Sequence, residues 1–350
     1  MVTATATPTP SATTTPTMTE TPTATATITE TPTVTPTASE TPTPTATATL
    51  TGAGLAYISN SGSNSVSVID VGSNAVVRSI LVGRTPFGVA VNTAGTRAYV
   101  TNLFDRTLSV IDVASNQVID TLPVGLLPRG VAVNPSGNRV YVANQLSGML
   151  SVIDTLTDEV NSITLGGSPY GVGVNPEAEG QVFVTDMSGG AVFVLDTVQG
   201  GLMEVPVDKA PLGVAVHPLG SFAYVANSGS DSVSVIDTET FVVSSVGVGG
   251  QPVAVAVNPS GTHVYVSNFT GNSVSVIDTT DNQVIATIPV ASNPFGISVD
   301  AQEKQVYVAN FAADKVSVIN IASSAVSTID VGSGPVAFGL FIIGPSTPNL

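Results

Sequence analysis

Apolar residues between positions 55 and 343 fall into many short runs that are rich in Val and Ile and are separated by Gly, Pro, Asn, Asp and Ser. Runs of this length and composition, bounded by turn-forming residues, predict β-strands. No segment keeps the 3.6-residue apolar spacing of an amphipathic helix over several turns. The pattern therefore predicts a folded part made of strands and tight turns, with essentially no helix.

The predicted strands are organised as a repeat with a period of about 42 residues. In each repeat an aromatic residue opens a run that ends in Asn or Asp: Tyr57–Asn60, Tyr99–Asn102, Tyr141–Asn144, Phe183–Asp186, Tyr224–Asn227, Tyr265–Asn268 and Tyr307–Asn310. A second run of the type Ser-Val-Ile-Asp follows each and ends at Asp70, Asp112, Asp154, Asp196, Asp237, Asp278 and Asn320. Seven copies at one period indicate a repeated supersecondary unit.

Each repeat holds four runs, named A to D in chain order. Run A resembles Pro128–Val133, run B is the aromatic run, run C is the Ser-Val-Ile-Asp run, and run D resembles Val284–Val290. Four strands in a repeat of this length are typical of a β-propeller blade. Run A carries small residues that suit a crowded axis. Run D carries Pro123, Pro206 and Pro289, and proline is confined to edge strands, so A is predicted innermost and D outermost.

The two ends of the repeat region complement each other. The first complete element is a run B over Ala56–Asn60 with no run A before it, and the last is a lone run A over Pro335–Leu340. Together they make one blade. The predicted fold is therefore all-β: a seven-bladed β-propeller of four-stranded antiparallel blades, closed by pairing the C-terminal strand with the three N-terminal strands.

The composition changes sharply before the repeats. Residues 1–50 consist largely of Thr, Pro and Ala, without any Lys or Arg, and they lack the bulky apolar surface needed to offset the entropy of ordering. We predict a disordered Thr/Pro-rich stalk or linker over 1–50, the propeller over 51–344 and a C-terminal tail over 345–350. An O-glycosylated stalk and a plain linker both fit this composition.

The run Tyr99-Val100-Thr101-Asn102, the Ser-Val-Ile-Asp runs and the Asn-Pro-Ser-Gly turns resemble the YVTN family of β-propellers over residues 55–343. Within this family the repeats are similar to those of archaeal and bacterial surface-layer proteins. The resemblance implies a seven-bladed propeller at a cell surface that acts in adhesion or assembly. It implies no shared catalytic motif. The sequence departs from the family pattern at Phe183–Asp186, at Ala254 and Ala337 in place of Gly, and at the turn 300–303.

Charge and composition exclude several function classes. The net charge is −16, from 25 acids and 9 bases, which disfavours nucleic acid because phosphate binding depends on Lys and Arg. The chain has no Cys, which excludes disulfides and cysteine-ligated metal sites. Its longest apolar run, Val336–Ile343, is too short to cross a bilayer. No signal peptide is visible at Met1. Either an export signal was trimmed, or it lies upstream, or the chain is cytoplasmic. The predicted stalk and the family resemblance favour an extracellular or cell-surface location.

The search for chemistry finds little. His217 and His263 lie in turns without other ligands at metal-binding spacing, and the repeated strand-end Asp residues are expected to cap turns. Asp186 breaks the repeat symmetry, which is a feature of catalytic acids, but the strand-end position favours turn capping here as well. Asn268-Phe-Thr270 is a single glycosylation sequon. We therefore expect no catalytic residues, no metal and no cofactor.

The residues that vary most between repeats gather in the D–A and B–C loops, which should surround one mouth of the central channel. From these loops we predict a ligand-binding set: Phe87, Arg129, Tyr170, Leu212, Phe295, Phe104, Phe269 and Phe311. Val253, Val336, Leu146 and Met187 lie at equivalent positions. An exposed apolar patch with aromatics and Arg indicates an interaction site; the alternative is that the same side chains fold inward and plug the channel.

These observations predict a monomeric, non-catalytic binding or adhesion scaffold whose partner is a surface glycan or protein. The alternative is a propeller hydrolase or lyase of the lactonase type with an active site at the channel mouth. The A–B and C–D loops hold a cluster of acids that includes Asp154, Asp158, Glu159, Glu177 and Glu179. We therefore expect one strongly acidic face, opposite a face of nearly balanced charge.

Overall fold

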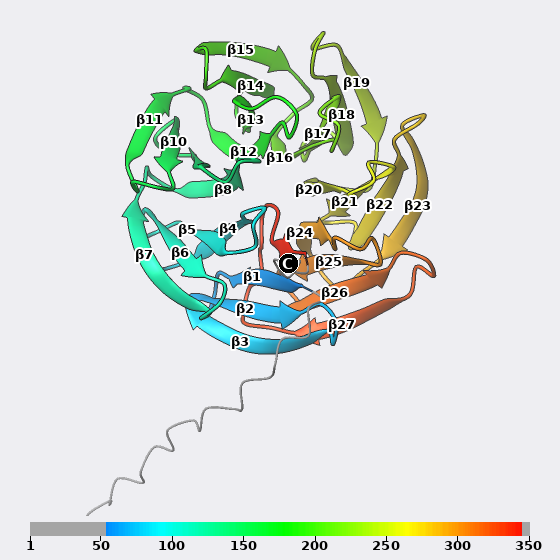
Figure 1. The fold of residues 1–350 in the computed structure, drawn as a ribbon. Coiled ribbons are helices and arrows are strands. Elements are labelled where there is room, and N and C mark those ends of the chain that lie inside the picture. Colours follow the sequence, from blue (N-terminus) through cyan, green and yellow to red (C-terminus); the bar gives the residue numbers. More distant parts are fainter. Residues whose placement is uncertain (1–53, 345–350) are drawn as a thin grey trace, which may run out of the picture. The chain divides into compact units, whose positions relative to one another are not determined.

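The structure is a computed structural model that describes residues 54–344. It contains seven four-stranded antiparallel sheets arranged around a central axis (Figure 1). This confirms the predicted seven-bladed propeller, and the described residues contain no helix. The predicted stalk over 1–50 and tail over 345–350 lie outside the described residues. Residues 54–344 accordingly provide no helix of the length and hydrophobicity that crossing a bilayer requires.

Strands within each blade follow the predicted order A, B, C, D from the axis outwards. The A strands are β4 (Pro86–Val91), β8 (Pro128–Val133), β12 (Pro169–Val174), β16 (Pro211–Val216), β20 (Pro252–Val257), β24 (Pro294–Val299) and β28 (Ile342–Ile343). The B strands are β1 (Leu55–Asn60), β5 (Arg97–Asn102), β9 (Arg139–Asn144), β13 (Gln181–Asp186), β17 (Phe222–Asn227), β21 (His263–Asn268) and β25 (Gln305–Asn310). The C strands are β2 (Ser65–Asp70), β6 (Thr107–Asp112), β10 (Met149–Asp154), β14 (Ala191–Asp196), β18 (Ser232–Asp237), β22 (Ser273–Asp278) and β26 (Lys315–Asn320). The D strands are β3 (Ala75–Leu81), β7 (Gln117–Pro123), β11 (Val160–Thr164), β15 (Gly201–Pro206), β19 (Val243–Gly247), β23 (Gln283–Pro289) and β27 (Val326–Asp330).

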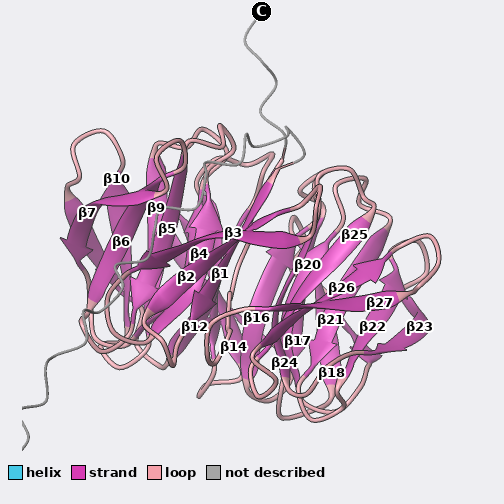
Figure 2. Ribbon diagram, turned by 90° about the horizontal axis from the view of Figure 1, so that it is seen from below, coloured by secondary structure: helices cyan, strands magenta, loops and turns pink. Residues whose placement is uncertain are grey.

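Successive antiparallel strands place the connecting loops at the two ends of the propeller (Figure 2). The D–A and B–C loops share one end, which we call the mouth face. The A–B and C–D loops share the other end, which we call the turn face. The predicted acidic cluster of Asp154, Asp158, Glu159, Glu177 and Glu179 therefore lies on the turn face, as the sequence predicted.

Buried aromatic residues of the B strands join neighbouring blades. Tyr57 donates its hydroxyl to Asn116 Oδ1 at 2.9 Å, and Asn116 belongs to the C–D turn of the next blade. Tyr141 and Thr197 form the corresponding contact across another blade boundary at 3.0 Å. The rings themselves are almost fully buried, and a buried aromatic ring contributes a large apolar area. Each such ring therefore fixes its blade against the next.

The Asn that ends most B strands is also structural. Its amide donates at 2.9 Å to a hydroxyl of the adjacent C strand in the pairs Asn102–Ser109, Asn144–Ser151, Asn227–Ser234, Asn268–Ser275 and Asn310–Ser317. These Asn side chains have no exposed surface. The amide of Asn268 is therefore inaccessible in the folded chain, and the sequon Asn268-Phe-Thr270 is not a usable glycosylation site there.

Glycine in the A strands lets the blades converge at the axis. A Cβ at Gly88 would collide with the backbone oxygen of Arg129 on the next blade. The hydroxyl of Thr101 links the same groups, since it accepts from the Gly88 N–H at 2.8 Å and donates to the Arg129 carbonyl at 2.8 Å. Ser59, Thr185 and Ser267 make equivalent bridges.

The strand-end acids cap turns, as predicted. Asp112 accepts the backbone N–H of Ser115 at 2.8 Å, and Asp237 accepts that of Thr240 at 2.7 Å. The hydroxyl and the backbone N–H of Ser115 lower the pKa of Asp112, and the backbone N–H of Thr240 lowers the pKa of Asp237. The turn 300–303, where the sequence departs from the family pattern, joins two blades. Its Glu303 accepts a hydrogen bond from the Asn258 amide of the preceding blade at 2.9 Å.

The closing strand differs from the prediction. A regular strand was expected over Pro335–Leu340, but Pro335 forms only an isolated bridge with Asn60, and the paired strand is β28 at Ile342–Ile343. Six residues separate Pro335 from Ile342, opposite three residues of β1. In blade β4–β7 only four residues, 87–90, separate Pro86 from Val91 opposite three residues of β5. The closing segment therefore carries two extra residues, and alignment of Ala337 with Gly88 identifies them as Phe338-Gly339.

Replacing Thr101 by Val should destabilise the propeller. The change keeps the side-chain shape but leaves the Gly88 N–H and the Arg129 carbonyl without their shared partner, and each unsatisfied buried group costs about 1–3 kcal/mol. We expect a loss of about 2 kcal/mol or more in urea unfolding. The same Thr→Val change at Thr121, which is exposed on β7, should stay within about 0.5 kcal/mol. Equal effects at both positions would contradict the bridging role.

Alkaline pH should unfold the chain through its tyrosines. Burial raises the pKa of Tyr170 and Tyr224 to about 12, and it also raises the pKa of Tyr57, Tyr99, Tyr265 and Tyr307. Because the folded pKa exceeds the unfolded value of about 10, stability is fully present below pH ~10 and is lost as pH rises above it. Tyrosinate absorbance should therefore appear together with the loss of β-sheet circular dichroism. Ionisation of most tyrosines near pH ~10 with an intact sheet signal would refute this.

Candidate functional site at the channel mouth

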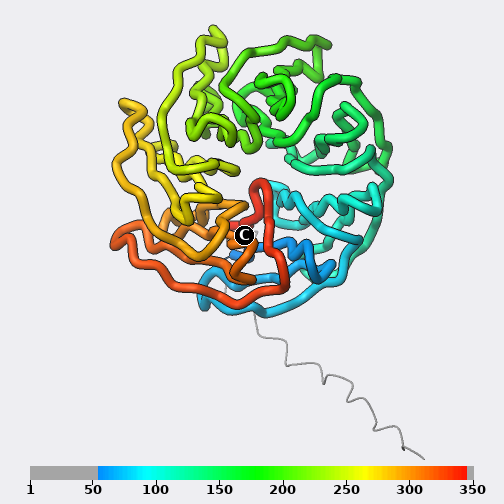
Figure 3. Tube along the Cα trace, turned by 180° about the vertical axis from the view of Figure 1, so that it is seen from behind, coloured from blue at the N-terminus to red at the C-terminus, as the bar shows by residue number. Residues whose placement is uncertain are grey.

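The extra residues of the closing segment plug the channel at the mouth face. In Figure 3 the C-terminal segment, drawn in red, turns into the centre of the ring. The ring of Phe338 is 3% exposed and lies 5.4 Å from Tyr170, 5.7 Å from Phe87 and 6.1 Å from Phe295, measured between ring centroids. The contacts with Tyr170 and Phe295 are edge-to-face, which is a favourable geometry for aromatic pairs. The Phe338 plug therefore organises the aromatic residues of the mouth.

The predicted site residues divide into two groups. Phe87, Tyr170 and Leu212 are buried at 5%, 6% and 9% exposure, and Val253 and Val336 are buried with them. For these five side chains the structure supports the inward alternative, in which they pack as core around the plug.

The second group of predicted residues faces solvent. Phe104 is 59% exposed and Phe311 is 42% exposed, and the equivalent Leu146 and Met187 are 68% and 37% exposed. Phe269 is half-buried and lies edge-to-face on Phe295, itself half-buried, at 6.0 Å. The mouth face thus has a packed aromatic centre surrounded by exposed apolar loop residues.

Arg129 lies at the edge of this centre. Its guanidinium carbon is 4.6 Å from the ring centroid of Phe87 and 5.1 Å from that of Tyr170. Its Nε donates to Gln145 Oε1 at 2.8 Å, and the side chain is half-buried. Stacking on two rings and one hydrogen bond together hold the guanidinium in one orientation.

Backbone hydrogen bonds join the two loop sets of the mouth face. The N–H of Gln145 donates to Leu127 O at 3.0 Å, and similar bonds link the B–C and D–A loops of the other blades. Thr85, Leu127, Ala210, Gln251 and Asn293, each directly before a proline, have φ between 51° and 55°. Such values are uncommon outside Gly and Asn and persist only where the surroundings impose them. The mouth face is therefore a rigid surface.

The carboxylate of Asp186 joins the D–A loop and the B–C loop of its blade. Its Oδ1 accepts from Ser168 N at 2.7 Å and from Ser188 N and Oγ at 3.1 Å and 2.9 Å. His217, on the turn face, pairs its Nε2 with Gly261 O at 3.0 Å. Within residues 54–344 no group of three or more His, Asp or Glu is arranged to hold a metal ion.

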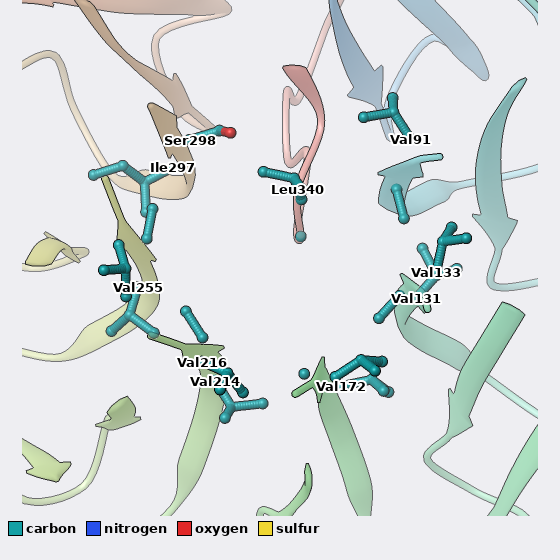
Figure 4. Close-up of a pocket in the computed structure, with 18 of the residues that line it drawn as sticks. Val91, Val131, Val133, Val172, Val214, Val216, Val255, Ile297, Ser298 and Leu340 are labelled. Atoms are coloured by element: carbon teal, nitrogen blue, oxygen red, sulfur yellow. The ribbon is translucent and has the colours of Figure 1, made fainter. Parts of the chain in front are cut away.

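Below the plug the channel continues as a cavity of about 240 Å³. Figure 4 shows its walls, formed by A-strand side chains such as Val131, Val172, Val214 and Ile297, with Leu340 projecting from the closing segment. Ser298 is the single polar side chain among the lining residues. The other side chains that line the cavity are apolar or absent, and backbone groups of the A strands complete its walls. It lies on the turn-face side of Phe338, so it is separate from the mouth.

Comparison with known proteins supports the fold. A family profile described as a YNCE-like beta-propeller matches residues 42–136 and 211–344, which is more than half of the chain. No curated protein sequence matches this chain. Residues 137–210, which include most of the third blade and the whole of the fourth, lie outside the family match.

Three solved structures are similar in fold. Kuenenia stuttgartiensis hydrazine synthase has a TM-score of 0.68 at 21% identity, covering 76% of this chain and 92% of that chain. A functionally unknown protein from Desulfotomaculum acetoxidans DSM 771 has a TM-score of 0.71 at 16% identity, covering 83% and 99%. A streptogramin B lyase has a TM-score of 0.62 at 15% identity, covering 70% and 83%. At these identities the likeness concerns the fold alone.

Replacing Phe338 by Ala should destabilise the chain by about 3–5 kcal/mol, the range for a buried Phe truncated in a packed core. Urea unfolding measures this loss. Phe311→Ala removes the same atoms from a 42% exposed site on the same face and should cost about 1 kcal/mol. A similar cost for the two variants would show that Phe338 does not act as a packed plug.

Proposed function

The chain belongs to the YNCE-like β-propeller family, and from this premise we propose that it is a non-catalytic binding scaffold at the cell surface. Its partner is a protein that docks on the mouth face. The contact residues are the exposed apolar loop residues together with Arg129, and the buried residues of the predicted set support them from beneath.

The observation that carries the proposal is the set of exposed apolar residues in the B–C loops of the mouth face. Phe104, Leu146, Met187 and Phe311 come from B–C loops of four different blades, and each is at least 37% exposed. Loops between strands are ordinarily polar, and apolar side chains gathered on one surface mark interaction sites. Aromatic residues, Met and Arg are also the residue types enriched in protein–protein interfaces.

Rigidity favours this surface as a docking site. The loops are held by backbone hydrogen bonds between the two loop sets, for example Phe269 N to Gln251 O at 2.9 Å. They also rest on the aromatic centre around Phe338. A surface that is already ordered loses little conformational entropy on binding, which increases affinity.

The cell-surface location rests on two features of the sequence. Residues 1–50 have the Thr/Pro composition of stalks on exported proteins, and the repeats resemble those of surface-layer proteins.

A hydrolase or lyase at the mouth is the competing function. Streptogramin B lyase and hydrazine synthase share the fold, but fold does not imply activity. The carboxylate of Asp186 already accepts three hydrogen bonds from its own loops. This engagement favours a structural role for Asp186 over a catalytic one.

The proposal predicts that partner binding depends on the mouth face. A photo-crosslinking residue placed at position 104 or 311 of the full chain should join a surface protein on cells of the organism that encodes it. Phe104→Ser combined with Phe311→Ser should reduce binding to these cells by about tenfold or more, since aromatic anchors contribute 2 kcal/mol or more when truncated. The melting midpoint should change little because both side chains are exposed.

The matched control is Leu156→Ser combined with Leu219→Ser, which removes two exposed apolar side chains from the turn face. This pair should leave binding intact. Binding that survives the mouth variant, or that falls equally in both variants, would overturn the proposal. Loss of binding after the cells are deglycosylated, with their proteins intact, would identify a glycan as the ligand in place of a protein.

A further inference from the structure

We infer that Arg129 forms a carboxylate-binding subsite on the mouth face, which receives a carboxylate that the ligand presents beside an apolar side chain. The inference rests on the proposed function, because it names the chemistry of the group that docks there. The subsite consists of Arg129 and Gln145, with Leu146 and Met187 as its apolar border.

The guanidinium is held ready for an anion. Phe87 and Tyr170 both face it, at 4.6 Å and 5.1 Å from their ring centroids, and Nε is committed to Gln145 Oε1 at 2.8 Å. The two terminal nitrogens donate no hydrogen bond to any group within residues 54–344. A planar guanidinium in this state presents its terminal N–H groups in the geometry that carboxylates accept.

Arg129 is the half-buried one of the three mouth-face bases that form no salt bridge within residues 54–344, since Arg106 and Lys209 are exposed. Arg84 forms a salt bridge with Asp105 at 2.6 Å, and Lys315 pairs with Asp330. Arg129 has no acidic partner among the residues that the structure describes, although the chain has 25 acids and only 9 bases. A half-buried cation without a counterion is costly, and a bound carboxylate would offset that cost.

The surroundings favour a carboxylate over a phosphate. One guanidinium supplies a single positive charge, which a carboxylate neutralises, whereas phosphate sites gather several donors and cations. The net charge of −16 also disfavours polyanions, because their affinity comes from many basic contacts.

The apolar border specifies what lies beside the carboxylate. The amide nitrogen of Gln145 contacts Met187 Sδ at 3.6 Å, so the group that orients Arg129 also touches an exposed thioether. Leu146 follows directly in the chain and is 68% exposed. A partner chain that ends in an apolar residue carries both features, a terminal carboxylate and an adjacent apolar side chain.

The test uses the full chain and two synthetic probes, acetyl-Leu-Phe with a free carboxylate and the same peptide as its carboxamide. Titration calorimetry should find that the amide binds about tenfold or more weakly, since hydrogen bonds to a charged group are stronger than those to a neutral one. Arg129→Gln should reduce binding of the free acid to the level of the amide. Arg106→Gln, which removes an exposed arginine of the same face, should preserve the discrimination.

Equal binding of the two peptides, or binding of neither at millimolar concentration, would overturn the inference. Discrimination that survives Arg129→Gln would do the same. Failure of the proposed function is separately visible. Cell binding that is unaffected by the Phe104 and Phe311 variant, alongside peptide discrimination that depends on Arg129, would reject the surface partner and retain the carboxylate subsite.

Discussion

Ring closure by the segment 335–343 is the constraint on which the rest of this structure depends. The segment pairs with β1 at its two ends. Its middle turns away and bonds to the neighbouring inner strand, with Val89 N donating to Phe338 O at 3.0 Å and Val91 N to Leu340 O at 3.0 Å. On the other side Gly296 N donates to Val336 O at 2.9 Å. One segment therefore satisfies strand edges on three blades, and an open edge here would leave unpaired backbone groups.

The two extra residues of this segment also determine what the mouth face is. Because both ends of the segment are paired, the surplus length has to leave the sheet, and it extends toward the axis. Phe338 then fills the space that Phe87, Tyr170 and Phe295 border. The same packing holds Arg129 against two rings and leaves the B–C loop residues exposed. Closure, channel plug and proposed binding surface thus share one physical cause.

Glycines and side-chain hydroxyls join neighbouring blades around the inner ring. Glycine at position 88 permits the carbonyl of Arg129 to approach, and the hydroxyl of Thr101 joins the two strands. Where the hydroxyl is absent another donor or acceptor is used, as at Gly296. The turn face is joined in a different way, through acceptors such as Glu303. Repetition of these contacts makes the inner ring rigid enough to support strained loops at the mouth.

The sequence by itself determined the seven blades, the four strands of each, the order of those strands and the closure of the ring by the C-terminal segment, although it placed the closing strand at Pro335–Leu340 and not at Ile342–Ile343. It could do so because each blade repeats the same alternation, turn chemistry and spacing, so local signals reinforce one another seven times. The capping role of residues such as Asp112 followed from the same local logic. Only the tertiary structure decided the burial of Phe87, Tyr170 and Leu212, because burial at a ring centre depends on what occupies the axis. That occupant, Phe338, was missed. The signal was present in the closing segment, which has two residues more than the other A runs, but the direction in which the extra length leaves the sheet is set by blades that lie far away in the sequence.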